Sequence, residues 1–357
     1  MQPTSGDLRW RAVDVEPEQP VKKTRGQRVF LVWRQKGLEA LKFEAGVPPD
    51  HAWGSWIEVS GGEDWSSIAN WAKRLFETDA ADVDVANWFG EAVKAEEMSA
   101  ERIVDFVQQE IRYLSLSLGE NSHRPRPANE VMSSRYGDCK DKSILLVTAL
   151  RSIGMKVDPV LVRSVGGSVL SEALPMRVHF NHVIVRAVIE GRTVFIDATN
   201  PFQRGTLQER PHMRFRWGLV AAEGQTGLVP ITPAFAHEQR IEYDRTFTLK
   251  DGEIWEESSA QYFGTGAEYA RAVLTGNPQF FEEGLERLVT SRNLQGKATA
   301  KFEETPEGSI QLNYRVPLAS KDKPLIVASL DMVQIVRRLE AGERPRSIVH
   351  PATYRFR

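Results

Sequence analysis

The chain has 357 residues, 41% of them hydrophobic and 26% charged, which is the composition of an ordinary folded protein with room for two or three domains. Its net charge of −2 gives no reason to expect nucleic acid or an anionic membrane as a partner. The one cysteine excludes an internal disulfide and a multi-cysteine metal site, and no apolar run reaches the roughly 18 residues that a transmembrane helix needs.

The N-terminal part, up to about residue 50, alternates short apolar runs with turn signals. Arg28–Trp33 has the apolar pattern of a buried strand, and Ala40–Glu44 that of a weaker one. Residues 1–14 are polar and lack the basic-then-apolar order of a signal peptide, so the chain as it stands is expected in the cytoplasm.

Two amphipathic helices are predicted next. Residues 60–97 carry apolar side chains, tryptophans among them, at helical spacing, which is more typical of a packed helix face than of an aromatic ligand platform. A second helix is expected over Ala100–Tyr113, with Ser99 as its N-cap.

The most periodic helix of the chain opens with the segment Arg135–Ser143. Apolar side chains between Ile144 and Ile153 occupy most of its surface, which predicts a central position in the core, and Gly154 is suited to end it. Strands are predicted after it at 157–162, 178–189 and 193–197.

Glu190-Gly191 is a hairpin turn signal between the last two of these strands. A helix followed by a strand and a hairpin indicates an α+β fold, in which the helix packs on an antiparallel sheet.

From about residue 240 the pattern changes to longer strands. A helical stretch at 269–293 is inserted among them, and a domain boundary is expected near Pro230–Arg240. The strands are predicted at 241–249, 253–261, 294–302 and 310–316.

Cys139 lies where a thiol could be activated. A thiol attacks a carbonyl carbon as its thiolate, and the first turn of a helix favours negative charge through its unpaired N–H groups and its dipole. Asp138 is a natural N-cap, and Gly137 permits a sharp turn before it. The charges of Lys140 and Lys142 are largely offset by the neighbouring aspartates, so the helix terminus carries the argument. The alternative is a small buried hydrophobe, but the apolar core positions begin only further along the helix.

A cysteine nucleophile needs a base, and among the seven histidines His182 stands out. It lies within the predicted strand 178–189, beside Phe180 and an apolar run, and a strand holds a ring more precisely than a loop does. A satisfied core histidine is the alternative interpretation. His179 has the opposite strand parity and is expected to face away.

Asp197 could orient this base. It closes the apolar run Val194–Ile196, where an unpaired carboxylate would be costly, although a turn or cap aspartate is the alternative. With a turn near Glu190-Gly191, residue 182 is predicted to lie opposite residue 199. His182 and Asp197 can then meet across the hairpin, directly or diagonally.

Four segments carry a family resemblance: Arg135–Lys142, Leu150–Gly154, Phe180–Val183 and Phe195–Thr199. Together they resemble the bacterial branch of the transglutaminase-like superfamily, over roughly residues 55–235. The resemblance implies a papain-like core with the nucleophile on a helix and the His and Asp on a sheet. It also implies the roles of three residues, with Cys139 as nucleophile, His182 as base and Asp197 as the residue that orients it.

The flanks resemble regions that accompany this core. Residues 1–55 are similar to the end of a β-rich domain that often precedes it in bacterial, usually exported, proteins, and residues 240–357 to the β-rich region that follows it. The resemblance thus implies a β-rich N-terminal remnant (1–55), a catalytic core (56–235) and a β-rich C-terminal domain (240–357). It also implies a periplasmic or exported protein if the chain is truncated at its N-terminus.

We therefore expect a thiol enzyme that acts on amide bonds of a peptide or protein through a thioester on Cys139, with hydrolysis favoured over transfer to an amine. The expected oxyanion donors are the Cys139 N–H and, as a second candidate, the hydroxyl of Tyr113, for which a core tyrosine is the alternative. Gln108 and Gln109 are weaker candidates, because a helical Gln pair usually faces solvent.

Two other functions stay open from the sequence. One is a binding module that keeps the fold without turnover. The other is a zinc site formed by the same cysteine, histidine and aspartate, although neither a metal nor a cofactor is expected. The sequence leaves the substrate and the oligomeric state open.

Overall fold

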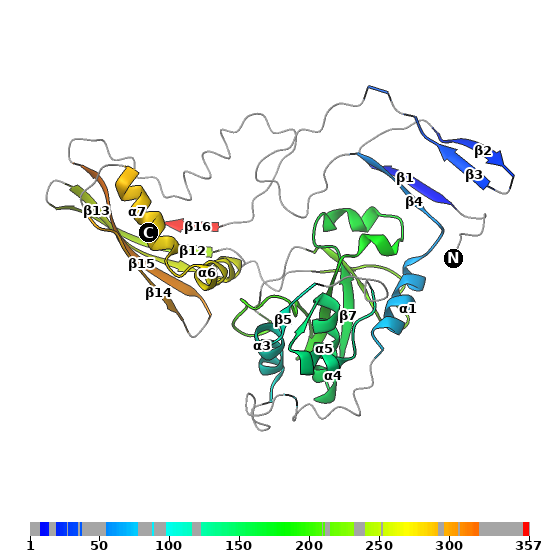
Figure 1. The fold of residues 1–357 in the computed structure, drawn as a ribbon, viewed down its shortest axis with the longest axis horizontal. Helices are drawn as coiled ribbons and strands as arrows, with labels where there is room; N and C mark the ends of the chain where they lie inside the picture. Colours follow the sequence, from blue (N-terminus) through cyan, green and yellow to red (C-terminus); the bar gives the residue numbers. More distant parts are fainter. Residues whose placement is uncertain are drawn as a thin grey trace. The chain divides into compact units, whose positions relative to one another are not determined.

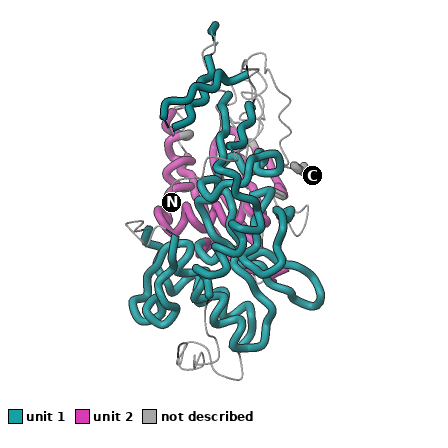
Figure 2. Tube along the Cα trace, turned by 90° about the vertical axis from the view of Figure 1, so that its right-hand side faces the viewer, with its two compact units in different colours: residues 1–199, 212–232 teal, residues 200–211, 233–357 magenta. Residues whose placement is uncertain are grey.

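The structure is a computed structural model. The chain divides into two compact units, one of residues 1–199 and 212–232 and the other of residues 200–211 and 233–357 (Figure 2). The chain therefore passes between the units three times. The structure describes residues 8–13, 19–26, 28–34, 36–37, 55–77, 88, 98–115, 123–208, 210, 215–231, 240–250, 253–291, 296–305, 308–320 and 353–356.

The first unit is built on a five-stranded antiparallel sheet with the strand order β11-β10-β7-β8-β9. Its middle strand, β7, is labelled in Figure 1. The strands β7, β8 and β9 follow one another in the chain and in the sheet, while β10 and β11 extend the sheet on the other side of β7. Their bounds are β7 (Val157–Val162), β8 (His182–Ile189), β9 (Arg192–Ile196), β10 (Trp217–Val220) and β11 (Val229–Pro230).

The hairpin between β8 and β9 has the predicted register. Val185 lies opposite Ile196, and continuing this register places residue 182 opposite residue 199. Glu190 and Gly191 form the two-residue turn and both have positive φ, at 50° and 77°, as a type I′ turn requires.

Helix α5 (Cys139–Ser152) packs against β7 and β8 and also contacts α3 (Ala100–Glu110) and α4 (Ala128–Ser134). All residues from Lys140 to Leu150 are buried. From Ile144 onward they are apolar except for Thr148, so the helix is apolar on more than a single stripe, while its first turn buries charged side chains. The predicted central helix is confirmed.

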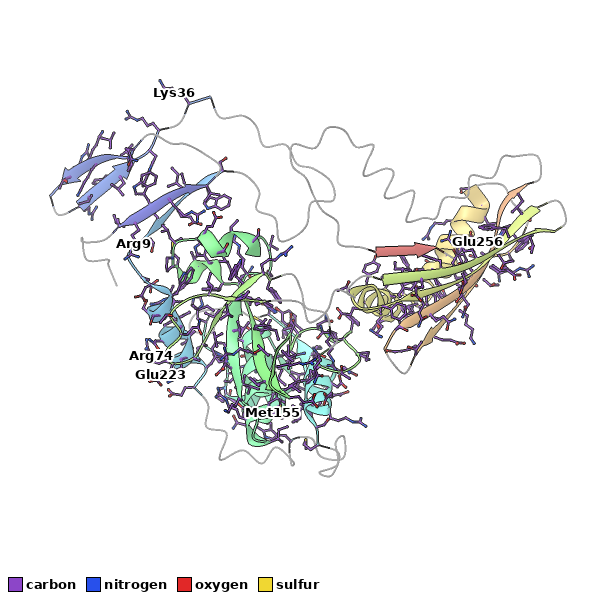
Figure 3. The ribbon with its side chains drawn as sticks, turned by 180° about the vertical axis from the view of Figure 1, so that it is seen from behind. Arg9, Lys36, Arg74, Met155, Glu223 and Glu256 are labelled. Atoms are coloured by element: carbon purple, nitrogen blue, oxygen red, sulfur yellow. The ribbon has the colours of Figure 1, made fainter. Side chains whose placement is uncertain are left out.

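Two contacts fix this helix at its middle and at its end. The Ser143 hydroxyl donates to the Val183 carbonyl at 3.1 Å, which ties the helix to β8. Gly154 ends the helix with φ 83°, and the Met155 N–H that follows donates to the Leu150 carbonyl at 3.1 Å (Figure 3).

Both faces of the sheet are covered. Because side chains alternate between the faces of a strand, Leu161 and Val183 pack on one face against α1 (Trp65–Leu75) and α5. Ile184 and Phe215 pack together on the other face. Each such fully buried apolar side chain contributes roughly 1.5–3 kcal/mol to stability.

The segment between β7 and β8 contains two short 3-10 helices, η4 (Gly167–Glu172) and η5 (Arg177–His179). The predicted strand over 178–189 therefore begins later than expected, at His182. His179 lies outside the strand, and its ring contacts the Leu174 carbonyl at 2.9 Å, so a strand-parity argument does not apply to it.

Two separate antiparallel pairs lie near the N-terminus, β1 (Arg9–Val13) with β4 (Trp56–Ser60) and β2 (Val21–Arg25) with β3 (Arg28–Val32). The prediction of a strand at β3 is confirmed, but the prediction that it is buried is wrong: its side chains are exposed or half-buried. A two-stranded hairpin is too small to cover both faces of a strand.

Two further predictions concern this part of the chain. The weaker strand Ala40–Glu44 lies outside the described residues, as does most of the predicted helix beyond residue 77. The tryptophan-bearing face of α1 packs in the core, as predicted, against Leu161, Val183 and their neighbours.

The second unit is a sheet with the order β14-β15-β13-β12-β16, in which all neighbours are antiparallel except β12 and β16. Helices α6 (Thr265–Gly276) and α7 (Phe280–Ser291) contact this sheet, so the predicted helical stretch is two helices. The strands are β12 (Arg240–Lys250), β13 (Glu253–Tyr262), β14 (Thr299–Glu304), β15 (Ile310–Ser320) and β16 (Thr353–Phe356).

The second unit has its own polar contacts as well as its own apolar core. Glu256 on β13 accepts a hydrogen bond from the Tyr314 hydroxyl at 2.8 Å (Figure 3). The chain is thus of mixed α+β class with a C-terminal sheet that is largely antiparallel. The division into parts 1–55, 56–235 and 240–357 stays a prediction. No helix in the described ranges is long and apolar enough to cross a membrane.

Candidate active site

Cys139 is the first residue of α5, directly after the N-cap Asp138. The Asp138 carboxylate accepts hydrogen bonds from the N–H groups of Lys140 at 3.1 Å and Asp141 at 3.2 Å, as predicted for an N-cap. The Cys139 side chain is partly exposed, so it is accessible while the helix terminus favours its thiolate.

Gly137 is required in this segment for a different reason from the one expected. Its backbone does not have a positive φ, but a Cβ at this position would lie 2.6 Å from the Cβ of Asp141. Crowding against the first turn of α5, and not conformational freedom, is what excludes a side chain here.

Charged side chains next to Cys139 form ion pairs that hold the helix start. Lys140 forms a buried ion pair with Asp138. Asp141 accepts two hydrogen bonds from Arg126, from the backbone N–H and from Nε, each at 2.9 Å. Arg126 also donates to the Tyr136 carbonyl, which anchors the segment that leads into the helix. Because the charge of Lys140 is paired with Asp138, the argument for activation of the thiol continues to rest on the helix terminus and not on the lysines.

His182 begins β8, and its ring has a partner on two sides. Nε2 lies 2.9 Å from Oδ2 of Asp197, and the Cys139 side chain is near enough to help raise the pKa of the imidazole. Since Nε2 is used by the carboxylate, Nδ1 is the ring nitrogen that remains for the sulfur. The Phe215 ring stacks on the imidazole, with the centroids 5.6 Å apart and an interplanar angle of 26°.

Asp197 directly follows β9 and is buried. Its Oδ1 accepts hydrogen bonds from the N–H and the hydroxyl of Thr199, at 2.9 and 2.7 Å, which leaves Oδ2 for His182. The carboxylate thereby fixes the orientation of the His182 ring. It also favours a proton on Nε2, the ring nitrogen that faces it. The structure thus brings Cys139, His182 and Asp197 together, in the order in which the sequence analysis linked them.

The electrostatics of this group favour the protonated form of His182. Burial by itself lowers the pKa of His182, but the charge and hydrogen bond of Asp197, followed by those of Cys139, raise it to about 10. Burial would raise the pKa of Asp197, yet the adjacent His182 and the Thr199 hydrogen bonds bring it below its usual value. In general, an imidazolium next to a thiol favours loss of the thiol proton.

Tyr113, the second predicted oxyanion donor, lies close to Cys139. Strand β5 (Arg112–Tyr113) pairs in parallel with β6 (Tyr136–Gly137), which sets Tyr113 opposite Gly137. The side chain is 49% exposed, so it is not a core tyrosine. Partial desolvation and then the charge on Cys139 raise the pKa of its hydroxyl, which therefore stays a protonated donor.

The two glutamines of α3 differ from each other. Gln109 is exposed, but Gln108 is only 2% exposed and its Nε2 donates to the backbone carbonyl of Asp197 at 2.8 Å. The expectation that both glutamines face solvent is wrong for Gln108. Its side-chain amide is engaged by the Asp197 carbonyl, so we no longer consider it a candidate oxyanion donor. The sequence could have predicted this burial, because the helical spacing of Gln108 from Val104 and Ile111 places it on the apolar stripe of α3.

Lys142, Phe215 and Arg126 also have roles that the sequence analysis missed. Lys142 is 1% exposed and lies on a row of α5 that is otherwise apolar or small, which could have marked it as unusual. Phe215 gave no signal, because its contact with His182 joins distant parts of the chain. Within the described ranges, no three His, Cys, Asp or Glu side chains gather so that they could hold a metal ion.

Comparison with known proteins gives one family match. Residues 84–195 match the model of the transglutaminase-like superfamily, a range that includes Cys139 and His182 and ends just before Asp197. A comparison with curated protein sequences gave no match.

Two solved structures are similar to the chain. A crystal structure of a putative protease from Parabacteroides distasonis ATCC 8503 aligns with TM-score 0.50 and 11% identity, over 89% of this chain. The chain spans 65% of that protein's length, and at this identity the likeness shows the fold alone. A putative cysteine protease from Cytophaga hutchinsonii aligns over 38% of this chain and 39% of its own, with TM-score 0.23 and 16% identity.

The family match and the α5–β7–β8 arrangement agree on the same part of the molecule. It is the part in which a cysteine at a helix start faces a histidine at the start of a strand. The chain therefore contains a domain of the transglutaminase-like superfamily at residues 84–195.

Proposed function

We propose that the protein is a papain-like thiol enzyme that transfers acyl groups from amide bonds of a peptide or protein substrate. The observation that carries this proposal is the His182 ring, which bonds the buried Asp197 carboxylate through Nε2 and has the Cys139 side chain near enough to help raise its pKa. A domain that only bound a ligand would have no use for a half-buried imidazolium close to a thiol.

In the first step, the thiolate sulfur of Cys139 attacks the amide carbonyl carbon and the C–N bond breaks. The His182 imidazolium gives its proton to the leaving amine, so that a thioester and a neutral imidazole remain. In the second step, the imidazole takes a proton from water, whose oxygen attacks the thioester. The C–S bond breaks, and the products are a carboxylic acid and the restored thiolate–imidazolium pair.

Negative charge develops on the carbonyl oxygen in both steps. The first N–H groups of a helix have no intrahelical acceptor, and Asp138 takes those of Lys140 and Asp141. The Cys139 N–H and the Tyr113 hydroxyl are the proposed donors to the oxyanion. An amine could replace water in the second step. We favour water, since excluding water in favour of an amine needs an enclosed acceptor channel.

Alkylation of Cys139 tests this proposal without knowledge of the substrate. Because Cys139 is the only cysteine, the pH dependence of the rate of iodoacetamide modification reports the ionisation of this one thiol. We expect rapid modification well below the pH range of an ordinary thiol in the wild type, and an ordinary thiol profile in His182→Ala. The exposed His123 provides the matched control, and His123→Ala should behave as the wild type. An ordinary thiol profile in the wild type would leave only a binding function.

The acceptor is tested separately by intact-mass measurement. Incubation with a peptide library should add an acyl group to Cys139 that disappears with time in water, and Cys139→Ser should form no labile adduct. Addition of a primary amine should not change the products. Accumulation of amine-linked products would instead identify a transglutaminase.

A further inference from the structure

We propose that Gln108 and Lys142 are positioning residues, which hold Asp197 in register with the nucleophile helix. This inference rests on the proposed thiol chemistry. It concerns a buried set of hydrogen bonds that joins α3, α5 and the turn after β9, none of whose members touches the thiol.

Lys142 lies one turn after Cys139 on α5, and its ammonium is buried at the end of α3. Nζ donates to the carbonyl of Ile111 at 2.6 Å and to the carbonyl of Gln108 at 3.1 Å. The last carbonyls of a helix lack intrahelical donors and attract positive charge. Helix α3 has no basic residue in its own last turn, so α5 supplies the cation.

Gln108 extends this connection to the acid of the site. Its carbonyl accepts from Lys142, and its side-chain amide donates to the carbonyl of Asp197 at 2.8 Å. Asp197 follows the last residue of β9 that pairs with β8, so the sheet ladder does not hold its carbonyl. Thr199 orients the Asp197 carboxylate, but it belongs to the same turn. Gln108 therefore fixes this turn relative to the two helices.

Burying the Lys142 ammonium costs desolvation energy, which indicates that its hydrogen bonds to the end of α3 have a role. Burial lowers its pKa to about 8, and only the more distant charge of Asp197 opposes that shift. A methionine would fill the same space without a desolvation penalty. The lysine is the residue that can bond both carbonyls at the end of α3, and through them the Gln108 backbone.

A hydrogen-bonded path thus runs from the helix that carries the nucleophile to the carboxylate that orients the base. Lys142 bonds Gln108, Gln108 bonds Asp197, and Asp197 bonds His182. Loosening this path should let the carboxylate shift against the imidazole, which would weaken the charge on His182 that favours the thiolate. Groups that hold a catalytic group in this way typically affect activity about 10- to 100-fold.

The test uses the full chain and the variants Gln108→Met and Lys142→Met, which keep side-chain volume and lose the donors. We expect iodoacetamide to modify Cys139 at neutral pH roughly tenfold more slowly in each variant, with the pH profile moved towards that of an ordinary thiol. The double variant should be no slower than the slower single one, because both changes break one path.

Exposed neighbours provide matched controls: Gln109→Met on α3 and Lys156→Met after α5 should leave the profile unchanged. Urea unfolding of each variant identifies a purely structural role. If Gln108→Met is less stable but keeps the wild-type alkylation profile, the inference is wrong while the proposed function stands. If the wild-type thiol is itself ordinary, the proposed function fails and the inference fails with it.

Discussion

The carboxylate of Asp197 has both oxygens engaged, Oδ2 with His182 and Oδ1 with the backbone and hydroxyl of Thr199. A buried carboxylate held in this way stays ionised, which is why its pKa is lowered although burial alone would raise it. It therefore stabilises the charged form of His182 more than the neutral form. That preference connects the geometry of one residue to the ionisation of the thiol.

The raised pKa of His182 also predicts how folding stability depends on pH. The folded value is about 10 against an ordinary value of 6.5. The folded state holds this proton more tightly, so the stabilisation is fully present below pH 6.5 and is lost as the pH rises through about 10. The total is on the order of 5 kcal/mol in the free energy of unfolding. Relative to His182→Gln, we expect the wild type to lose stability over this interval in urea titrations.

Lys142 acts in the opposite direction at the alkaline end. Its pKa is lowered to about 8 in the folded state, so its contribution to stability rises between pH 8 and its ordinary value of 10.5. The comparison with His182→Gln cancels this effect, because Lys142 is present in both proteins. A stability difference that does not vary with pH would show that His182 is not held as an imidazolium.

The sequence was informative where a residue's neighbours reveal its environment. The Gly-Asp-Cys pattern predicted that Cys139 begins a helix, and the apolar run predicted that His182 lies on a strand; Cys139 does begin α5, and His182 begins β8. Gln108 was misjudged, because its residue type suggests exposure and its partner, Asp197, lies far along the chain. Lys142 was counted only as a charge, since nothing local shows that α3 ends beside it.

Among the elements, the loop between β7 and β8 contacts Phe215, the residue whose ring stacks on His182. Its first 3-10 helix, η4, begins at Gly167, where a Cβ would lie only 2.2 Å from the carbonyl oxygen of Phe215. Phe215 is almost fully buried and stacks on His182. The close approach of two backbones therefore sets the position of the ring that covers the base.

Substitution of Gly167 by alanine tests this support. Because the conflicting atom is backbone, the chain must move, and we expect a loss of about 1–3 kcal/mol in the free energy of unfolding together with slower alkylation of Cys139. Gly227→Ala is the matched control, since nothing lies within 4 Å of its added Cβ. Equal stability of the two variants in urea would show that η4 adjusts freely.

The elements themselves were predicted unevenly. The hairpin of β8 and β9 followed from its turn dipeptide, which fixes a register locally. Strand β10 was not predicted, because a four-residue strand buried in the sheet lacks the alternation that marks a strand, and its partner β7 is distant in sequence. Two of the five strands in the sheet that holds His182, β10 and β11, were therefore not predicted from the sequence.

At the scale of the whole molecule, the two units interleave along the chain. The first unit needs residues 212–232, which supply β10 and β11, although residues 200–211 belong to the second unit. The family match ends at residue 195, so a fragment cut to that match would lack both Asp197 and β10. Domain limits taken from the family model would divide a single sheet.

Two truncated chains test this organisation. A chain of residues 1–232 should keep the activated alkylation profile of Cys139. A chain of residues 1–199 should unfold at much lower urea concentration and show an ordinary thiol, because Val160 and Val162 lose the strand that covers them. Circular dichroism checks the fold of each. An activated thiol in the shorter chain would show that β10 is dispensable for the site.

The late position of β10 also has a consequence for protein synthesis. The ribosome releases Cys139, His182 and Asp197 before Phe215 and β10, which pack on the same sheet as the base. A nascent chain therefore carries the three residues of the proposed site for a period in which Phe215 and β10 have not yet been synthesised. We expect the thiol to acquire its reactivity only when the last strands of its sheet emerge from the ribosome. The unfolded nascent chain would then be least able to react with its own peptide bonds.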